Sequence, residues 1–152
     1  MNVTHQHYFP PRKNERLFKT RKQYYRRIYA AIDDGTMPGY DTCSSSCLYG
    51  FQDVEGQERH CVAGLLCPDG ELPPKADCSI KGIPLNKDYF LSLLPDDMQL
   101  TELYALQECH DYYAASRPDR PSWEDSKDEI KAAFQQLEAS RKWEEPDEDD
   151  ED

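Results

Sequence analysis

Cys61, His110 and Asp111 are the residues whose types could carry out covalent chemistry in this chain. A nucleophilic thiol needs a base within hydrogen-bonding distance and a third group that orients the base. Adjacent helical residues point about 100° apart, so we expect Asp111 to orient His110 poorly. The alternative, which we prefer, is that Cys61 is a small core residue and His110 a buried, hydrogen-bonded one.

The six cysteines could instead bind a metal ion. Structural zinc sites use tetrahedral sulfur and nitrogen ligands, usually with at least one closely spaced pair of cysteines. Cys43 and Cys47 have that spacing, whereas Cys61 and Cys67 are further apart. A structural zinc would therefore be held at Cys43 and Cys47, and the alternative is a set of reduced thiols with no cofactor.

A basic segment between residues 12 and 27 is the third candidate site. Its cations could neutralise phosphates while Phe18, Tyr24 and Tyr25 stack on bases, as in non-specific nucleic-acid binding. A net charge of −12 opposes that function, so the plainer interpretation is a basic face that packs against the chain's own acidic surface. The candidate anion-binding residues are Arg16, Lys19, Arg21, Lys22, Arg26 and Arg27.

Residues 144–152 form the fourth candidate, because all of them except Pro146 are acidic. Such a run cannot bury surface and predicts a disordered tail. The tail could fold back on the basic segment, bind a basic partner protein in place of a phosphate backbone, or only keep the chain soluble. The candidate partner-binding residues are Glu144, Glu145, Asp147, Glu148, Asp149, Asp150, Glu151 and Asp152.

Charge is sorted along the whole chain. Residues 1–40 hold eight basic and three acidic side chains, and the remainder holds ten basic and twenty-seven acidic ones. This asymmetry indicates a protein that meets its partners through electrostatics, without naming the partner.

The length of 152 residues predicts one domain. We place a flexible arm at residues 1–12, a globular domain at 13–143 and the tail at 144–152. Because no stretch approaches the roughly 18 apolar residues of a membrane span, we expect no membrane association. The N-terminus lacks the apolar run of a signal peptide, so we expect a cytoplasmic location and, there, reduced cysteines.

The elements that must position these residues are mainly helical, and we predict an α+β fold with one small hairpin. Apolar spacing predicts helices at about 16–34, 85–94, 97–116 and 122–142, with a capping box at Thr20 and a stop at Gly35. Residues 43–62 predict the β-hairpin. We expect the first, third and fourth helices to form the core, in a monomer or weak dimer.

Two short motifs resemble an uncharacterised family of small bacterial and phage proteins. His60-Cys61-Val62-Ala63-Gly64-Leu65-Leu66 resembles that family's CA-[IV]-G-x-L-I segment and follows Cys47-Leu48-Tyr49, which resembles its Cys-x-Tyr strand. Leu103-Tyr104-Ala105-Leu106-Gln107-Glu108-Cys109-His110-Asp111 matches its L-x-x-L-Q-x-x-H-D segment. The resemblance covers roughly residues 44–113. It implies a shared fold and a phage or prophage setting. It does not supply an activity, because none is assigned to that family.

These observations leave three functions open. We favour a small acidic phage or prophage protein that binds a host protein with a basic, nucleic-acid-handling surface and inhibits or redirects it, without being an enzyme. The first alternative is a hydrolase or transferase that uses Cys61 and His110. The second is a nucleic-acid-binding module that works through residues 12–27.

Overall fold

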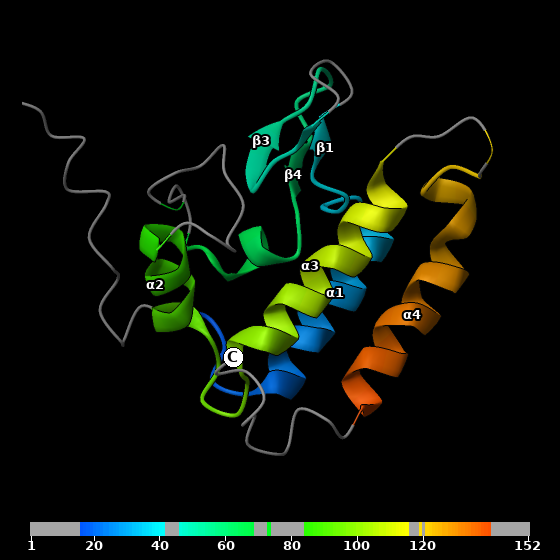
Figure 1. Ribbon diagram of the computed structural model, residues 1–152. Helices are drawn as coiled ribbons and strands as arrows, with labels where there is room; N and C mark the ends of the chain where they lie inside the picture. Colours follow the sequence, from blue (N-terminus) through cyan, green and yellow to red (C-terminus); the bar gives the residue numbers. More distant parts are fainter. Residues whose placement is uncertain are drawn as a thin grey trace, which may run out of the picture.

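The computed structural model describes residues 16–41, 46–68, 73, 84–115, 119 and 121–140 (Figure 1). The fold is α+β and mainly helical, as the sequence predicts. The predicted limits of the arm and of the acidic tail lie outside the described residues.

Helix α1 (Arg21–Asp34) ends where predicted but begins at the capping box of Thr20, not at residue 16. The Thr20 hydroxyl accepts the backbone N–H of Gln23, and the Gln23 side chain accepts the backbone N–H of Thr20, which completes the capping box. Gly35 ends the helix in the left-handed conformation, with φ of 86°. The buried face of α1 consists of Tyr24, Tyr25, Ile28, Ala31 and Ile32.

The predicted hairpin is confirmed by the antiparallel pair β3 (Gly50–Gln52) and β4 (Glu58–His60). Asp53 organises the turn, because its carboxylate accepts the backbone N–H groups of Glu55 and Gln57. A second antiparallel pair, β1 (Tyr40–Asp41) and β2 (Ser46–Cys47), precedes it. Two-residue strands are too short to show alternation, which is why the sequence did not predict this pair.

The apolar segment after β4 forms a buried 3₁₀ helix, η3 (Ala63–Leu66). The sequence left this segment open between helix and strand. Tertiary contact constrains it, since a Cβ atom on Gly64 would collide with the backbone carbonyl of Tyr49.

The remaining helices are α2 (Pro84–Leu93), α3 (Leu100–Ala114) and α4 (Lys127–Ala139). The predicted helix from residue 122 begins instead with a 3₁₀ turn, η4 (Glu124–Ser126). Ser122 precedes this turn, and its hydroxyl accepts the backbone N–H of Asp125 at 3.2 Å. None of the helices in these described ranges is long and apolar enough to cross a membrane.

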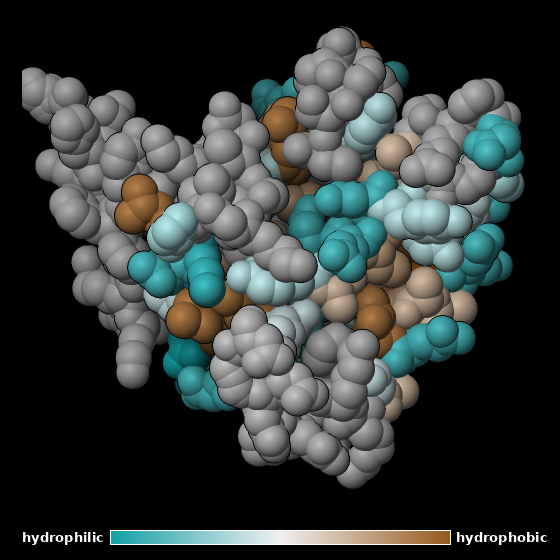
Figure 2. All heavy atoms as spheres, in the orientation of Figure 1, coloured by the Kyte–Doolittle hydropathy of each residue, from teal (hydrophilic) through white to brown (hydrophobic). Residues whose placement is uncertain are grey.

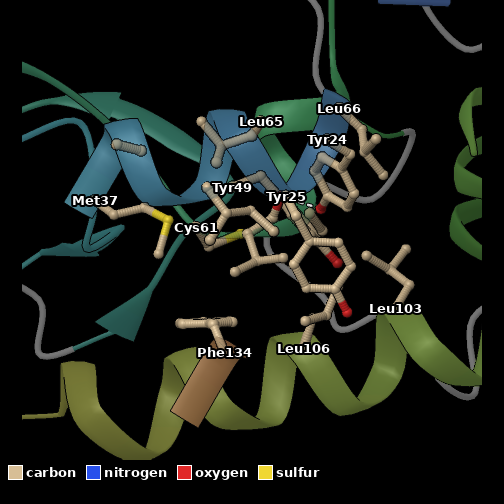
Figure 3. Close-up of a cluster of buried hydrophobic side chains, with 14 of the residues drawn as sticks. Tyr24, Tyr25, Met37, Tyr49, Cys61, Leu65, Leu66, Leu103, Leu106 and Phe134 are labelled. Atoms are coloured by element: carbon tan, nitrogen blue, oxygen red, sulfur yellow. Dashed lines mark hydrogen bonds between the residues drawn. The ribbon is translucent and has the colours of Figure 1, made fainter. Parts of the chain in front are cut away.

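Side chains from α1, α3 and α4 form the core, as predicted, and η3 adds to it (Figure 3). Tyr24 and Tyr25 from α1 meet Leu103 and Leu106 from α3 and Phe134 from α4. Helix α2 joins through Phe90, whose ring centroid lies 5.3 Å from that of Tyr49. These helices therefore hold the β4–η3 segment, which carries Cys61, inside the protein.

Candidate functional site

Cys61 lies inside the hydrophobic core with 1% of its surface exposed. Figure 3 shows Cys61 within the cluster of buried side chains that also contains Met37, Tyr49 and Tyr25. Burial raises the pKa of the thiol to about 12, although the backbone N–H of Gly64 donates to Sγ at 3.4 Å. Because a thiolate is the reactive form of cysteine, this environment maintains an unreactive thiol at neutral pH.

His110 is completely buried on α3, and both of its ring nitrogens have partners. The backbone N–H of Gly39 donates to Nε2 at 2.9 Å. Since Nε2 is an acceptor, Nδ1 carries the proton and donates to Asp111 Oδ1 at 2.9 Å. Neither nitrogen is therefore available to remove a proton from Cys61.

The expectation that Asp111 orients His110 poorly is wrong. Nδ1 lies next to the point where the imidazole ring joins its side chain, so the short Asp111 side chain can reach it from the next position. The angle of about 100° between the Cα–Cβ bonds of these adjacent helical residues therefore does not prevent the hydrogen bond.

Gln107 links the two short motifs and was not singled out from the sequence. Its carbonyl oxygen accepts the backbone N–H of Ala63 at 2.9 Å, and its Nε2 donates to Asp111 Oδ1 at 3.1 Å. The i to i+4 spacing of Gln107 and Asp111 was the available signal. Gly39 completes the arrangement, because a Cβ atom there would collide with the backbone N of Cys61. The described contacts of Cys61, Gln107, His110 and Asp111 connect helix α3 with Gly39 and with the segment that follows β4.

The predicted zinc ligands cannot be placed, since Cys43 and the side chain of Cys47 lie outside the described residues. Within the part of the chain that the structure describes, no group of three or more His, Cys, Asp or Glu side chains could hold a metal ion. Cys61, Cys67 and Cys109 form no disulfide bond among the described residues.

Three of the six predicted anion-binding residues are paired with the chain's own oxygen atoms. Arg16 contacts Asp96 at 2.8 Å, Arg21 contacts Glu102 at 2.7 Å, and Arg27 lies 3.6 Å from Asp34. The other three are exposed, and no described carboxylate pairs with their side-chain charges; they are Lys19, Lys22 and Arg26.

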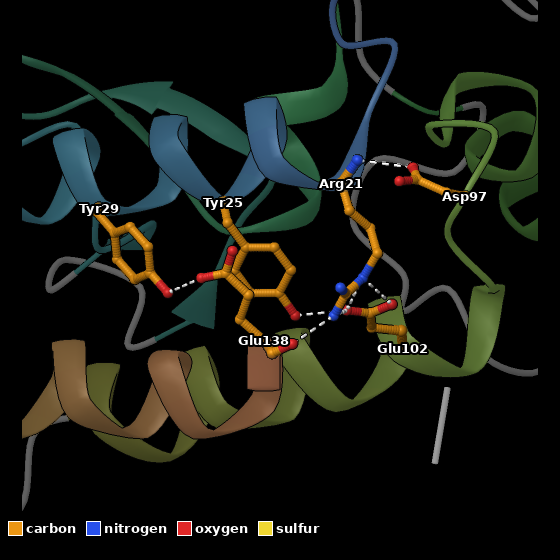
Figure 4. A network of polar contacts seen from close by, with 6 residues as sticks. All are labelled: Arg21, Tyr25, Tyr29, Asp97, Glu102 and Glu138. Atoms are coloured by element: carbon orange, nitrogen blue, oxygen red, sulfur yellow. Dashed lines mark hydrogen bonds and ion pairs between the residues drawn. The ribbon is translucent and has the colours of Figure 1, made fainter. Parts of the chain in front are cut away.

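The pairing of Arg21 belongs to a polar network that the sequence patterns did not reveal (Figure 4). Glu102 is completely buried, receives two N–H groups of the Arg21 guanidinium and accepts the Tyr25 hydroxyl at 2.6 Å. The Glu102 carboxylate holds the pKa of Arg21 above its usual value. The sequence did contain one feature that could have predicted this network. Glu102 lies four residues before buried Leu106, which places an acidic residue on the core side of α3.

The same network joins α4 to α1. The Arg21 guanidinium donates to the backbone carbonyl of Glu138 at 2.9 Å, and the Tyr29 hydroxyl donates to the Glu138 carboxylate at 2.6 Å. The C-terminal end of α4 is therefore fixed beside α1 by contacts of Glu138 with Arg21 and Tyr29.

Acidic and aromatic side chains meet where the C-terminal half of α3 packs beside the start of α4. Tyr112 is 53% exposed, and its ring packs edge-to-face against Tyr113 with centroids 5.0 Å apart. The Tyr113 hydroxyl donates to Glu129 at 3.3 Å. Hydrophilic residues gather along the α4 side of the molecule in Figure 2. We call this surface the acidic–aromatic face; its members are Glu108, which lies one turn before Tyr112 on α3, together with Tyr112, Tyr113 and Glu129.

No family model matches this chain, and neither a curated protein nor a solved structure gives a match. The assignment of function therefore rests on these surfaces and on the chemistry of their side chains.

Proposed function

We propose that this chain is a non-enzymatic interaction protein that binds a basic, nucleic-acid-handling surface of another protein and inhibits or redirects that protein. The acidic–aromatic face is the observation that supports the proposal. In the phage setting that the sequence resemblance implies, the partner is a host protein in the cytoplasm, and this chain acts as a monomer or weak dimer.

The composition of the face suits a partner rich in arginine. Tyrosine supplies a large rigid contact area at low entropic cost, and such residues dominate binding energy at interfaces. Tyr112 is 53% exposed, and aromatic rings attract the guanidinium group of arginine. Glu108 and Glu129 would flank that contact with negative charge, which accelerates association and selects a basic partner.

The buried state of Cys61 favours this proposal over the first alternative. A hydrolase or transferase needs a thiolate that a substrate can reach, whereas this sulfur is in the core and its pKa is raised to about 12. For the nucleic-acid-binding alternative, three cations are already paired with the chain's own carboxylates.

A pull-down from a nuclease-treated bacterial lysate tests the proposal. The bait is the full chain, beside a version truncated after Trp143 and the double variant Glu108→Gln/Glu129→Gln. We expect one stoichiometric partner that is retained at low salt, weakened at moderate salt, and reduced about tenfold or more by the double variant, as for the loss of two charge contacts.

The matched control is Glu55→Gln/Asp88→Asn, which removes the same charge from exposed positions in the hairpin turn and on α2. This control should retain the partner. Equal loss with both double variants would show that only net charge matters, and an empty pull-down with the full chain at low salt would refute the proposed function.

A further inference from the structure

We propose that the acidic segment 144–152 docks in cis on the three exposed cations of α1 and its N-terminal flank. The basic stripe is defined as Lys19, Lys22 and Arg26. This inference does not rest on the proposed partner, because the contact is within one chain and can be measured without any other protein.

The basic stripe is left over after the chain has paired its other described N-terminal cations. Arg16, Arg21 and Arg27 each contact a carboxylate, whereas no described residue contacts the charged groups of the basic stripe. Lys22 and Arg26 lie one turn apart on the same face of α1. The N-terminus of α1 already has an acidic partner, because the Asp97 carboxylate accepts the backbone N–H of Arg21 at 2.7 Å. The attraction for a further anionic group therefore comes from the side-chain cations of the basic stripe.

The C-terminal end of α4 lies beside the N-terminal end of α1, where Lys22 is located. The backbone carbonyl of Glu138 accepts a hydrogen bond from Arg21, one residue before Lys22. The same side of α1 that carries Lys22 and Arg26 also carries Asp33, which pairs with Lys131 of α4. The basic stripe thus runs beside the contact between the two helices, on the side where α4 ends.

The length of the chain after α4 is sufficient for the contact. Glu144 follows Ser140 by four residues, which can span at most about 14 Å when extended. Lys22 and Arg26 are separated by about 6 Å along the helix axis. Eight carboxylates that begin within this reach have a high effective concentration near the stripe, on the order of millimolar for a short link.

Charge complementarity selects this occupant. The segment supplies eight negative charges with no positive one, and the stripe supplies three positive charges with no described partner. Docking would cover the cations of α1 and thereby suppress non-specific binding of nucleic acid to this helix. It would also hold the acidic segment away from other basic surfaces.

Competition by a synthetic peptide tests the contact. A fluorescent peptide with the sequence of residues 144–152 is titrated into the chain truncated after Trp143 and into the full chain at low salt. We expect binding to the truncated chain that is lost at high salt, and binding at least about tenfold weaker to the full chain, where the linked segment occupies the stripe.

Substitutions identify the surface. In the truncated chain, Lys22→Gln and Arg26→Gln should each weaken peptide binding several-fold, whereas Lys87→Gln on exposed α2 should not. Circular dichroism confirms that each variant is folded. The proposal is overturned if the truncated chain does not bind the peptide, if both chains bind it equally, or if Lys87→Gln has the same effect as Lys22→Gln.

Discussion

The substitution Arg21→Met should destabilise the protein far more than the substitution Glu102→Gln. Without Arg21, the fully buried Glu102 carboxylate retains only the Tyr25 hydroxyl among its described partners. Removing one member of a buried ion pair costs about 3–5 kcal/mol, because the remaining charge is left uncompensated. The Arg21 side chain is 23% exposed, so we expect a value near the lower end, about 3 kcal/mol.

The reverse change leaves no buried charge. In the Glu102→Gln variant the introduced side chain is neutral, and the Arg21 guanidinium would keep the Glu138 carbonyl and contact with solvent. We expect this substitution to cost about 1–2 kcal/mol, the scale of a lost charge-assisted hydrogen bond. The double variant Arg21→Met/Glu102→Leu removes both charges and should recover a large part of the loss caused by Arg21→Met alone.

Urea unfolding at 25 °C measures these differences through the midpoint and slope. Arg27→Met is the matched control, because the Arg27–Asp34 pair is 35% and 54% exposed and separated by 3.6 Å. Such a surface pair contributes about 0–1 kcal/mol. If Arg21→Met cost no more than Arg27→Met, or no more than Glu102→Gln, the reasoning from burial would be wrong.

Three further predictions concern the buried segment around Cys61. In native protein at neutral pH, a thiol reagent should label Cys61 far more slowly than in urea, and fast native labelling would contradict the buried thiol. Burial raises the pKa of Cys61 from 9.0 to about 12, so the folded state holds this proton more tightly than the unfolded state does. The stability that results is fully present below pH 9 and is lost as the pH rises through 12. The urea midpoint should therefore fall over this pH range, and Cys61→Ala should reduce the dependence of the midpoint on pH. Gly64→Ala should destabilise by several kcal/mol through collision with the Tyr49 carbonyl, whereas Gly56→Ala, with φ of 84° in open space, should cost only about 1 kcal/mol; equal urea midpoints for the two glycine variants would refute the close approach.

The local signals in the sequence were sufficient to predict the helices. Thr20, Gln23 and Gly35 act through hydrogen bonds and backbone conformation within a few residues, so the limits of α1 can be recognised without tertiary information. Periodic apolar residues likewise identified α3 and α4, since the residues that recur every turn are those that pack inward.

Contacts between distant segments determined the parts that the sequence could not settle. The conformation of Ala63–Leu66 depends on Tyr49 and Gln107, and strands β1 and β2 are too short to carry a pattern of their own. The pairing of His110 with Gly39 joins positions 71 residues apart. Such contacts leave no periodic mark on the sequence.

The amino-acid sequence by itself determined the mainly helical α+β class, the capping box and C-terminal stop of α1, and the separation of charge along the chain. Only the tertiary structure decided which charges are used internally, because burial and distance, not residue type, distinguish Arg21 from Arg26. It also decided that Cys61 and His110 serve packing and hydrogen bonding, since the core surrounds the thiol and both imidazole nitrogens are occupied.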